Sequence, residues 1–171
     1  MMIFKKAILP VLAVLAVSAW AVPATAQTAP AAPTGLAGTA LGESSITWSW
    51  NAVVASTGYN FYFSTGGSVS VATTYYVQAG LSKNTPYGGR VSAVNLSTES
   101  ALSAYATAYT LAAVPGTLSK VFAADTFIIV QWDPNGNPVG TAYEVEYSYS
   151  DGGGVHTSSF AVSYTSPTAS G

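Results

Sequence analysis

Four oxygen-bearing side chains lie at a spacing that is typical of a calcium-binding loop. Asp133 stands at position 1, and Asn135 and Asn137 follow at positions 3 and 5. Glu144 falls at position 12, where a glutamate normally binds Ca²⁺ through both carboxylate oxygens. The helix-flanked loop also requires glycine at position 6, but this chain has Pro138 there. We therefore interpret the run as a turn-rich loop between two strands and expect no metal site in it.

A second chemistry to consider is acid–base or nucleophilic catalysis around His156, the only histidine in the chain. Cysteine is absent, so His156 has neither a second histidine nor a thiolate with which to bind a transition metal. Serines and acids are numerous, but the G-x-S-x-G sequence that exposes a nucleophilic serine on a sharp turn does not occur. His156 follows three glycines that are typical of a hairpin turn. We expect an exposed loop histidine, no catalytic or cofactor-binding residue, and no enzyme activity.

Aromatic side chains could also form a platform on which sugar rings stack. The inward candidates alternate with polar residues along two segments, and they are Trp48, Trp50, Tyr59 and Phe61. Because large aromatic residues dominate the cores of β-sandwiches, we expect these four to fill a core. The outward aromatic residues, which are the better candidates for surface contacts, are Tyr62, Tyr76 and Tyr105.

The elements that carry these residues are predicted to be short strands separated by turns. Residues 45–50 and 59–63 alternate between apolar and polar side chains, and residues 73–77 are rich in β-branched and aromatic types. Gly66 and Gly67 signal a turn, and residues 105–111 predict a later strand. Within residues 27–111, no stretch has helical periodicity. The sequence therefore predicts an all-β fold.

Residues 81–95, LSKNTPYGGRVSAVN, are the most informative stretch of the chain. Tyr87, Val91 and Ala93 lie at even spacing, which places them on one face of a strand. A tyrosine just ahead of such a strand resembles the tyrosine corner of sandwich domains, where the phenol hydroxyl bonds to upstream backbone. We expect the Tyr87 hydroxyl to bond to backbone between Leu81 and Pro86.

The same stretch resembles the L-x-P-x-T-x-Y-x-x-x-V-x-A-x-N signature of fibronectin type III domains. Lys83 replaces the proline of the signature, and Gly89 replaces an apolar residue. Because cores resist voids, we expect Trp48 to fill the space that Gly89 leaves. The resemblance implies an immunoglobulin-like β-sandwich whose structural core contains Trp50, Tyr59, Leu81, Tyr87, Val91, Ala93, Trp132, Tyr143 and Val145.

A second copy of the pattern follows the first. Pro33, Leu36, Ile46 and Trp50 recur in the same order and at the same spacing as Pro115, Leu118, Ile128 and Trp132. Tyr59 recurs as Tyr143, after a longer loop. Repetition at a domain-sized period predicts tandem sandwiches. Because Gly171 aligns with Gly80, we expect the second copy to be incomplete and the chain to be the N-terminal fragment of a longer protein.

Residues 1–26 are predicted to be a secretory signal peptide. Lys5 and Lys6 precede an apolar run, and Ala24-Thr25-Ala26 fits the cleavage pattern. The alternative is an uncleaved membrane anchor, for which the run is short. We expect a spacer at residues 27–32, a fibronectin type III-like domain at residues 33–113 and an incomplete second one at residues 114–171.

Composition narrows the function further. Charged residues make up 7% of the chain, and after the leader only Lys83, Arg90 and Lys120 are cationic. A basic surface for nucleic acid is therefore not expected, and neither is a stable membrane span once the leader is cleaved. We predict a secreted or cell-surface structural or interaction module whose unknown ligand is a protein or a carbohydrate. The alternatives are accessory modules of a secreted carbohydrate-active hydrolase with a catalytic domain beyond Gly171, and a self-assembling surface subunit.

Overall fold

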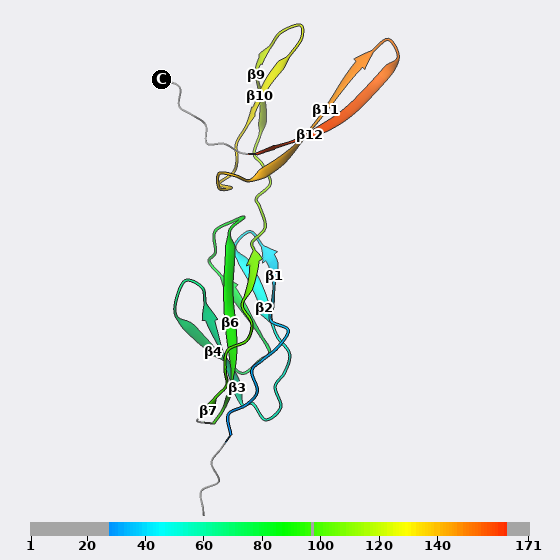
Figure 1. Ribbon diagram of the computed structural model, residues 1–171. Helices are drawn as coiled ribbons and strands as arrows, with labels where there is room; N and C mark the ends of the chain where they lie inside the picture. Colours follow the sequence, from blue (N-terminus) through cyan, green and yellow to red (C-terminus); the bar gives the residue numbers. More distant parts are fainter. Residues whose placement is uncertain (1–27, 97, 164–171) are drawn as a thin grey trace, which may run out of the picture.

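The computed structural model describes residues 28–96 and 98–163, and within these residues all twelve regular elements are β-strands. The predicted leader and the equivalence of Gly171 with Gly80 lie outside the described residues. In the part of the chain that the structure describes, no helix is long and apolar enough to cross a membrane. Two units follow one another (Figure 1): the first unit holds β1 to β8, and the second unit, residues 114–163, holds β9 to β12.

The first unit is a sandwich of two antiparallel sheets. The smaller sheet has the order β1-β2-β5, with β1 at Ala37–Gly42, β2 at Ser45–Ser49 and β5 at Tyr75–Ala79. The larger sheet has the order β4-β3-β6-β7, with β8 also pairing β6. Its strands are β3 at Gly58–Phe63, β4 at Ser68–Val71, β6 at Pro86–Asn95, β7 at Thr98–Glu99 and β8 at Ala106–Tyr109.

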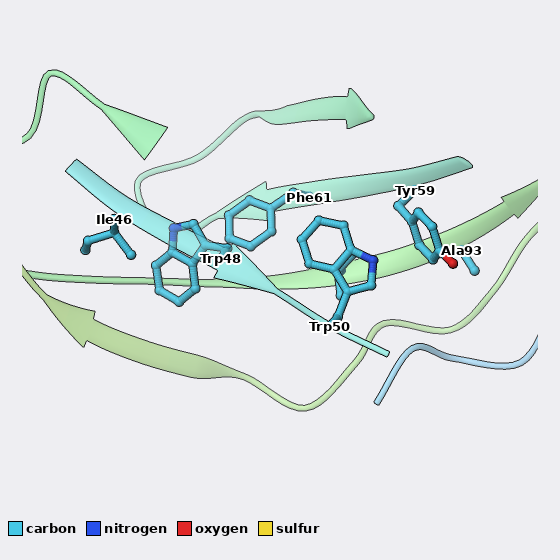
Figure 2. Close-up of a cluster of buried hydrophobic side chains, with 7 residues drawn as sticks. Ile46, Trp48, Trp50, Tyr59, Phe61 and Ala93 are labelled. Carbon is cyan, nitrogen blue, oxygen red and sulfur yellow. The ribbon is translucent and has the colours of Figure 1, made fainter. Parts of the chain in front are cut away.

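The core of the first unit lies between the two sheets (Figure 2). Alternate side chains of β2, β3 and β6 point into it, as the period of a strand requires. The buried cluster contains Ile46, Trp48, Trp50, Tyr59, Phe61, Val91 and Ala93. The rings of Trp48 and Phe61 lie 5.3 Å apart, and those of Trp50 and Tyr59 meet edge to face at 5.5 Å. Aromatic contacts across the two sheets therefore hold the sandwich together.

The strand β5 differs from its prediction in its bounds and in the direction of Tyr76. It begins at Tyr75, and Tyr76 lies directly opposite Trp48 of β2. Because opposite residues of an antiparallel pair share one face of the sheet, Tyr76 must point inward with Trp48. Its ring packs 5.8 Å from Phe61, whereas Tyr75 is exposed. The prediction that Tyr76 faces solvent is therefore wrong.

Two glycines of the first unit lie beneath aromatic rings, but not in the predicted pairing. A Cβ atom placed on Gly89 would lie 2.5 Å from Cζ of Phe61 and 2.6 Å from the carbonyl oxygen of Tyr62. Trp48 instead lies over Gly38, where a Cβ would come within 2.7 Å of its ring. The prediction that Trp48 fills the space at Gly89 is wrong, because Phe61 already fills it.

The tyrosine corner is present at the start of β6. The backbone N–H of Ser82 donates a hydrogen bond of 2.9 Å to the hydroxyl of Tyr87. Leu81 and Tyr87 are partly buried and pack against the core cluster. The backbone N–H of Leu81 also bonds to the carbonyl of Ser44 at 3.0 Å. These contacts fasten the loop that precedes β6 to both sheets.

The second unit consists of two antiparallel hairpins. Strands β9 (Leu118–Ala123) and β10 (Ile128–Trp132) form one, and β11 (Ala142–Asp151) and β12 (Gly154–Ser163) form the other. Figure 1 shows the hairpins diverging towards their tips. Most of their apolar side chains are exposed, although the rings of Trp132 and Tyr143 meet at 5.5 Å.

Candidate functional site

Hydrogen bonds join the two units where the linker of residues 112–114 passes between them, and we call this region the junction. Three segments meet there: the tyrosine-corner loop of the first unit, the linker, and the loop that leads from β10 to β11. In both loops, Asn residues adopt the left-handed backbone conformation that Asn tolerates better than most residues, with φ of 44° at Asn84 and 52° at Asn135. These turns direct polar groups from both units towards the linker.

Asn137 is the centre of the junction and is only 4% exposed. Its Oδ1 accepts a hydrogen bond of 2.7 Å from the backbone N–H of Ala113. Its Nδ2 donates to the Ala113 carbonyl at 2.8 Å and to the Tyr143 hydroxyl at 3.0 Å. Because Ala113 is also buried, at 3% exposed, its peptide groups depend on this side chain. Each such group left without a partner would cost about 1–3 kcal/mol.

The tyrosine-corner loop contributes two further contacts to the second unit. Lys83 donates through Nζ to the carbonyl of Asn135 at 2.8 Å. Asn84 donates through Nδ2 to the hydroxyl of Thr141 at 2.8 Å, and that hydroxyl in turn donates to the carbonyl of Pro138. The loop that locks β6 in the first unit therefore also holds the second unit.

Lys83 is the charged group of the junction. Its Nζ lies 3.4 Å from Oε2 of Glu43, and both side chains are partly open to solvent. An ion pair of this kind contributes between about 0 and 1 kcal/mol, because water screens it. Both residues belong to the first unit, so this ion pair helps to position Lys83, and it is the bond to the Asn135 carbonyl that reaches the second unit.

The four side chains with calcium-like spacing are all engaged in hydrogen bonds within the protein. Asp133 Oδ1 accepts from the backbone N–H of Asn135 at 2.8 Å, and Asn135 donates through Nδ2 to the Val114 carbonyl at 2.9 Å. Glu144 accepts from the hydroxyl of Ser159 at 2.7 Å on the neighbouring strand. Asp133, Asn135 and Asn137 are thus engaged in the turn and in the junction, and Glu144 bonds across the second hairpin. Across residues 28–96 and 98–163, no three His, Cys, Asp or Glu residues gather as a metal site would require.

A second polar cluster lies on the outer face of the larger sheet around Glu99. The Glu99 carboxylate accepts hydrogen bonds from Ser92, from Tyr62 at 2.5 Å and from Asn60 at 3.1 Å. The Ser92 bond, followed by those of Tyr62 and Asn60, lowers the pKa of the Glu99 carboxyl. Its bond with Glu99 is also the main reason why the pKa of the Tyr62 phenol is raised. The cluster therefore favours an ionised carboxylate beside a neutral phenol, and its groups satisfy one another.

The two remaining candidates for surface contacts, Tyr105 and His156, have different neighbours. Tyr105 is exposed, and the guanidinium carbon of Arg90 lies 5.9 Å from the centre of its ring. His156 is exposed as well, but it lies on β12 rather than in a loop, stacked on Tyr149 at 4.9 Å. Its Nε2 lies 3.2 Å from Oδ1 of Asp151. The backbone N–H of Gly153, and then His156, lower the pKa of the Asp151 carboxyl.

The structure places the predicted core residues at different depths. In the first unit, Trp50 and Tyr59 are each 5% exposed and Val91 and Ala93 are fully buried, while Leu81 and Tyr87 pack around them. In the second unit, Tyr143 is 9% exposed, and Trp132 and Val145 are only partly buried.

The sequence reasoning missed the residues that make the junction. In the sequence alone, Lys83 is only a departure from the signature, and no pattern indicates a role for Asn84 or Thr141. Asn137 has the spacing of a calcium ligand, but its amide binds the linker backbone. One signal was present in the sequence. Lys83 stands where the signature has proline and is followed by Asn84, in a loop that the tyrosine corner fixes in place.

Comparison with known proteins supports the architecture. No protein-family model matches the chain, and no curated protein matches it. A two-domain fibronectin type III segment of chicken tenascin superposes with a TM-score of 0.50 at 18% identity, covering 77% of this chain and 77% of that one. A Fn3-like protein from Clostridium thermocellum is 31% identical, with a TM-score of 0.41 over 47% of this chain and 92% of its own. FN3tt is 23% identical, with a TM-score of 0.45 over 50% of this chain and 98% of its own. The chain has the all-β, immunoglobulin-like fold of fibronectin type III domains.

Proposed function

We propose that this protein is a non-catalytic extracellular spacer, in which two fibronectin type III-like modules are held at a fixed angle to present whatever is attached at either end. The modules span residues 33–113 and 114–171, after a signal peptide at residues 1–26 and a spacer at residues 27–32. The fold supports a spacer or interaction role, because solved structures with this fold include multi-domain segments such as that of tenascin. A fold alone does not define a function, so the junction carries the proposal.

The observation that carries the proposal is the two-way hydrogen bond between Asn137 and Ala113. Contacts between domains of one chain are usually small and polar, and relative motion is the default expectation. Here the second unit binds the linker itself, and Lys83 and Asn84 bind the second unit from the other side. A linker whose peptide groups are bound in this way has lost the freedom that lets neighbouring modules tumble independently.

Residual dipolar couplings measured on residues 27–171 test the fixed angle. In the unmodified protein we expect one alignment tensor to fit both units. Asn137→Ala removes the bonds to Ala113, so two different tensors should be needed. Asn51→Ala is the matched control, because Asn51 also makes a side-chain bond, to Thr34, but lies far along the chain from the junction. Independent tensors in the unmodified protein would overturn the spacer proposal.

Export is tested separately by N-terminal sequencing of the protein recovered outside the cell. We expect the sequence to begin at Gln27, after Ala24-Thr25-Ala26. Material that retains Lys5 and Lys6 would contradict the proposed signal peptide.

A further inference from the structure

The two asparagines that bind the linker, Asn135 and Asn137, differ in chemical stability. Asn135 is the one asparagine of the chain that glycine follows. The backbone nitrogen of Gly136 can attack the amide carbon Cγ of the Asn135 side chain, because glycine has no Cβ to block the approach. Asn137 is safe from this reaction, because Pro138 follows it and a proline nitrogen carries no proton.

The attack leads to deamidation, one of the reactions that make asparagine thermolabile. A bond forms between the Gly136 nitrogen and Cγ of Asn135, and the bond from Cγ to Nδ2 breaks. The proton of the Gly136 nitrogen leaves with the amide nitrogen as ammonia. Water then opens the cyclic imide: cleavage at Cγ gives aspartate, and cleavage at the main-chain carbonyl gives isoaspartate. The reaction therefore consumes only water and needs no oxidant or cofactor.

Contacts of the junction hold both reacting groups. Asn135 and Gly136 have positive φ of 52° and 71°, and the N–H of Asn137 bonds to the carbonyl of Pro134 at 3.1 Å, which makes a tight turn. The turn fixes the peptide that contains the attacking nitrogen. The bond of 2.9 Å from Nδ2 of Asn135 to the Val114 carbonyl fixes the plane of the amide that is attacked.

Either product removes a contact that holds the linker. Both lack Nδ2, so the Val114 carbonyl loses this donor. Aspartate places against that carbonyl a carboxylate, which accepts hydrogen bonds but does not donate them. Isoaspartate adds a methylene to the main chain inside the turn, which displaces Asn137 from the peptide groups of Ala113 that it binds. A junction that opens and reacts therefore does not close again in the same way.

We propose that Asn135 and Gly136 form a deamidation site that the closed junction protects, and that the reaction converts a fixed angle between the units into a flexible one. The inference rests on the proposed spacer function, to which it adds an irreversible change. In the closed junction the turn and the Val114 bond keep the amide and the attacking nitrogen from turning towards each other. When opening and closing are fast compared with the reaction, the rate of deamidation follows the population of open molecules.

The test measures deamidation of residues 27–171 at neutral pH, by mass spectrometry of the fragment that contains Asn135. Labelling with an isoaspartyl methyltransferase distinguishes isoaspartate from aspartate. A synthetic peptide with the sequence of residues 131–141 gives the rate without a junction. We expect the protein to react about ten-fold more slowly than the peptide, or slower still. Asn137→Ala, which removes the bonds to Ala113, should restore most of the peptide's rate.

Three controls isolate the cause. The peptide with Asn137→Ala shows whether the substitution itself changes the chemistry, and we expect its rate to equal that of the original peptide. Asn51→Ala removes a side-chain bond to Thr34 in the first unit and should leave the rate of the protein unchanged. Gly136→Ala, added to the Asn137→Ala protein, should suppress the reaction, because its methyl group hinders the attack.

The effect of the product is tested with Asn135→Asp, since aspartate tolerates the left-handed backbone of the turn. Residual dipolar couplings of this variant should require two alignment tensors. A single tensor for Asn135→Asp would overturn the inference. So would equal rates in protein and peptide, or no acceleration by Asn137→Ala in a protein whose units share one tensor. The spacer proposal fails on a different result, which is two tensors in freshly prepared, unmodified protein.

Discussion

The two units contain the same aromatic pair in two different surroundings. Trp50 and Tyr59 meet at 5.5 Å with their ring planes 65° apart, and Trp132 and Tyr143 meet at 5.5 Å and 68°. In the first unit the pair lies under β6 and is 5% exposed at both residues. In the second unit no strand equivalent to β6 is among the described residues, and Trp132 is only partly buried.

The two units show which contacts of this fold form locally and which need a strand that is distant in the sequence. The aromatic contact depends on residues from two hairpins and forms without further strands. Burial of the rest of the face depends on β6, which follows β3 in the first unit only after β4 and β5. Tyr147 and Phe160, on the second hairpin, accordingly remain 47% and 52% exposed. Pairing of β6, a strand distant in the sequence, with β3 therefore covers the aromatic pair and closes the core.

The largest expected difference is in hydrogen exchange. Amides of β2 and β6 should open only with global unfolding, which costs about 5 kcal/mol or more in a stable domain. Amides of β10 and β11 should open for less than about 2 kcal/mol, because little apolar surface covers them. Equal protection of the two units in a monomer would contradict the comparison.

The next largest difference between the units is expected in the cost of large-to-small substitutions at equivalent positions. Trp48→Val should lower the free energy of unfolding by about 3 kcal/mol or more, because the ring is fully buried. Its counterpart is Val130, which is only partly buried, and Val130→Ala should cost less than about 1.5 kcal/mol. Urea unfolding followed by circular dichroism measures both. Similar costs would show that the second unit has a closed core.

Gly89→Val tests how fully the first core is packed. A side chain there meets Phe61 and the carbonyl of Tyr62, so the substitution should cost about 1–3 kcal/mol through overpacking. It should also fail to rescue Trp48→Val, since Trp48 lies over Gly38 instead. The double variant is compared with both single variants by urea unfolding, and any recovery would mean that the two sites share space.

The tyrosine corner exists only in the first unit among the described residues, so its hydroxyl should matter there. Tyr87→Phe leaves the N–H of Ser82 without its partner and should cost about 1–2 kcal/mol. Tyr109→Phe, at a 59% exposed position, should stay within about 0.5 kcal/mol. Tyr62 is a poor control because it bonds to Glu99. Thermal unfolding of the two variants provides the measurement. Equal shifts in the unfolding temperature would show that the bond to the Tyr87 hydroxyl does not stabilise the first unit.

The smallest effect concerns pH. The pKa of the Glu99 carboxyl is lowered in the folded state, so its contribution to stability is present above its ordinary value of 4.5 and is lost as the pH falls through the folded pKa. Because the group is exposed, the loss should be less than about 1 kcal/mol. Glu99→Gln should flatten the stability profile of the first unit below pH 4.5. An unchanged profile would show that the Ser92, Tyr62 and Asn60 bonds do not favour the ionised form.

The sequence predicted the fold through residues whose roles are local. Alternation along β2 and β3 placed Trp48 and Phe61 inward, and the spacing before β6 predicted the bond to the Tyr87 hydroxyl. Tyr76 was misplaced because its segment is apolar on both faces, and only its pairing with Trp48 decides which side faces the core. The strand β4 was not predicted, since SVSV after two glycines resembles a polar loop.

The junction could not be predicted, because it depends on how two units meet rather than on a pattern within either. Asn137 has a side chain that suits a metal, a turn or a backbone partner equally well. Only the approach of Ala113, from the linker that precedes the second unit, selects among these. Gly89 illustrates the same limit, since the ring that covers it comes from a neighbouring strand.

The bonds of Asn84 also give an expected order of folding for the two units. Its backbone N–H bonds to the carbonyl of Leu111 at 3.0 Å, within the first unit, while its side chain bonds to Thr141. We therefore expect the side chain to be held in place for the second unit once the tyrosine-corner loop has formed. Because domains generally fold from the N-terminus during synthesis, the first unit would be ready as a template when the second emerges. We therefore expect the second unit to take its position against a first unit that is already folded.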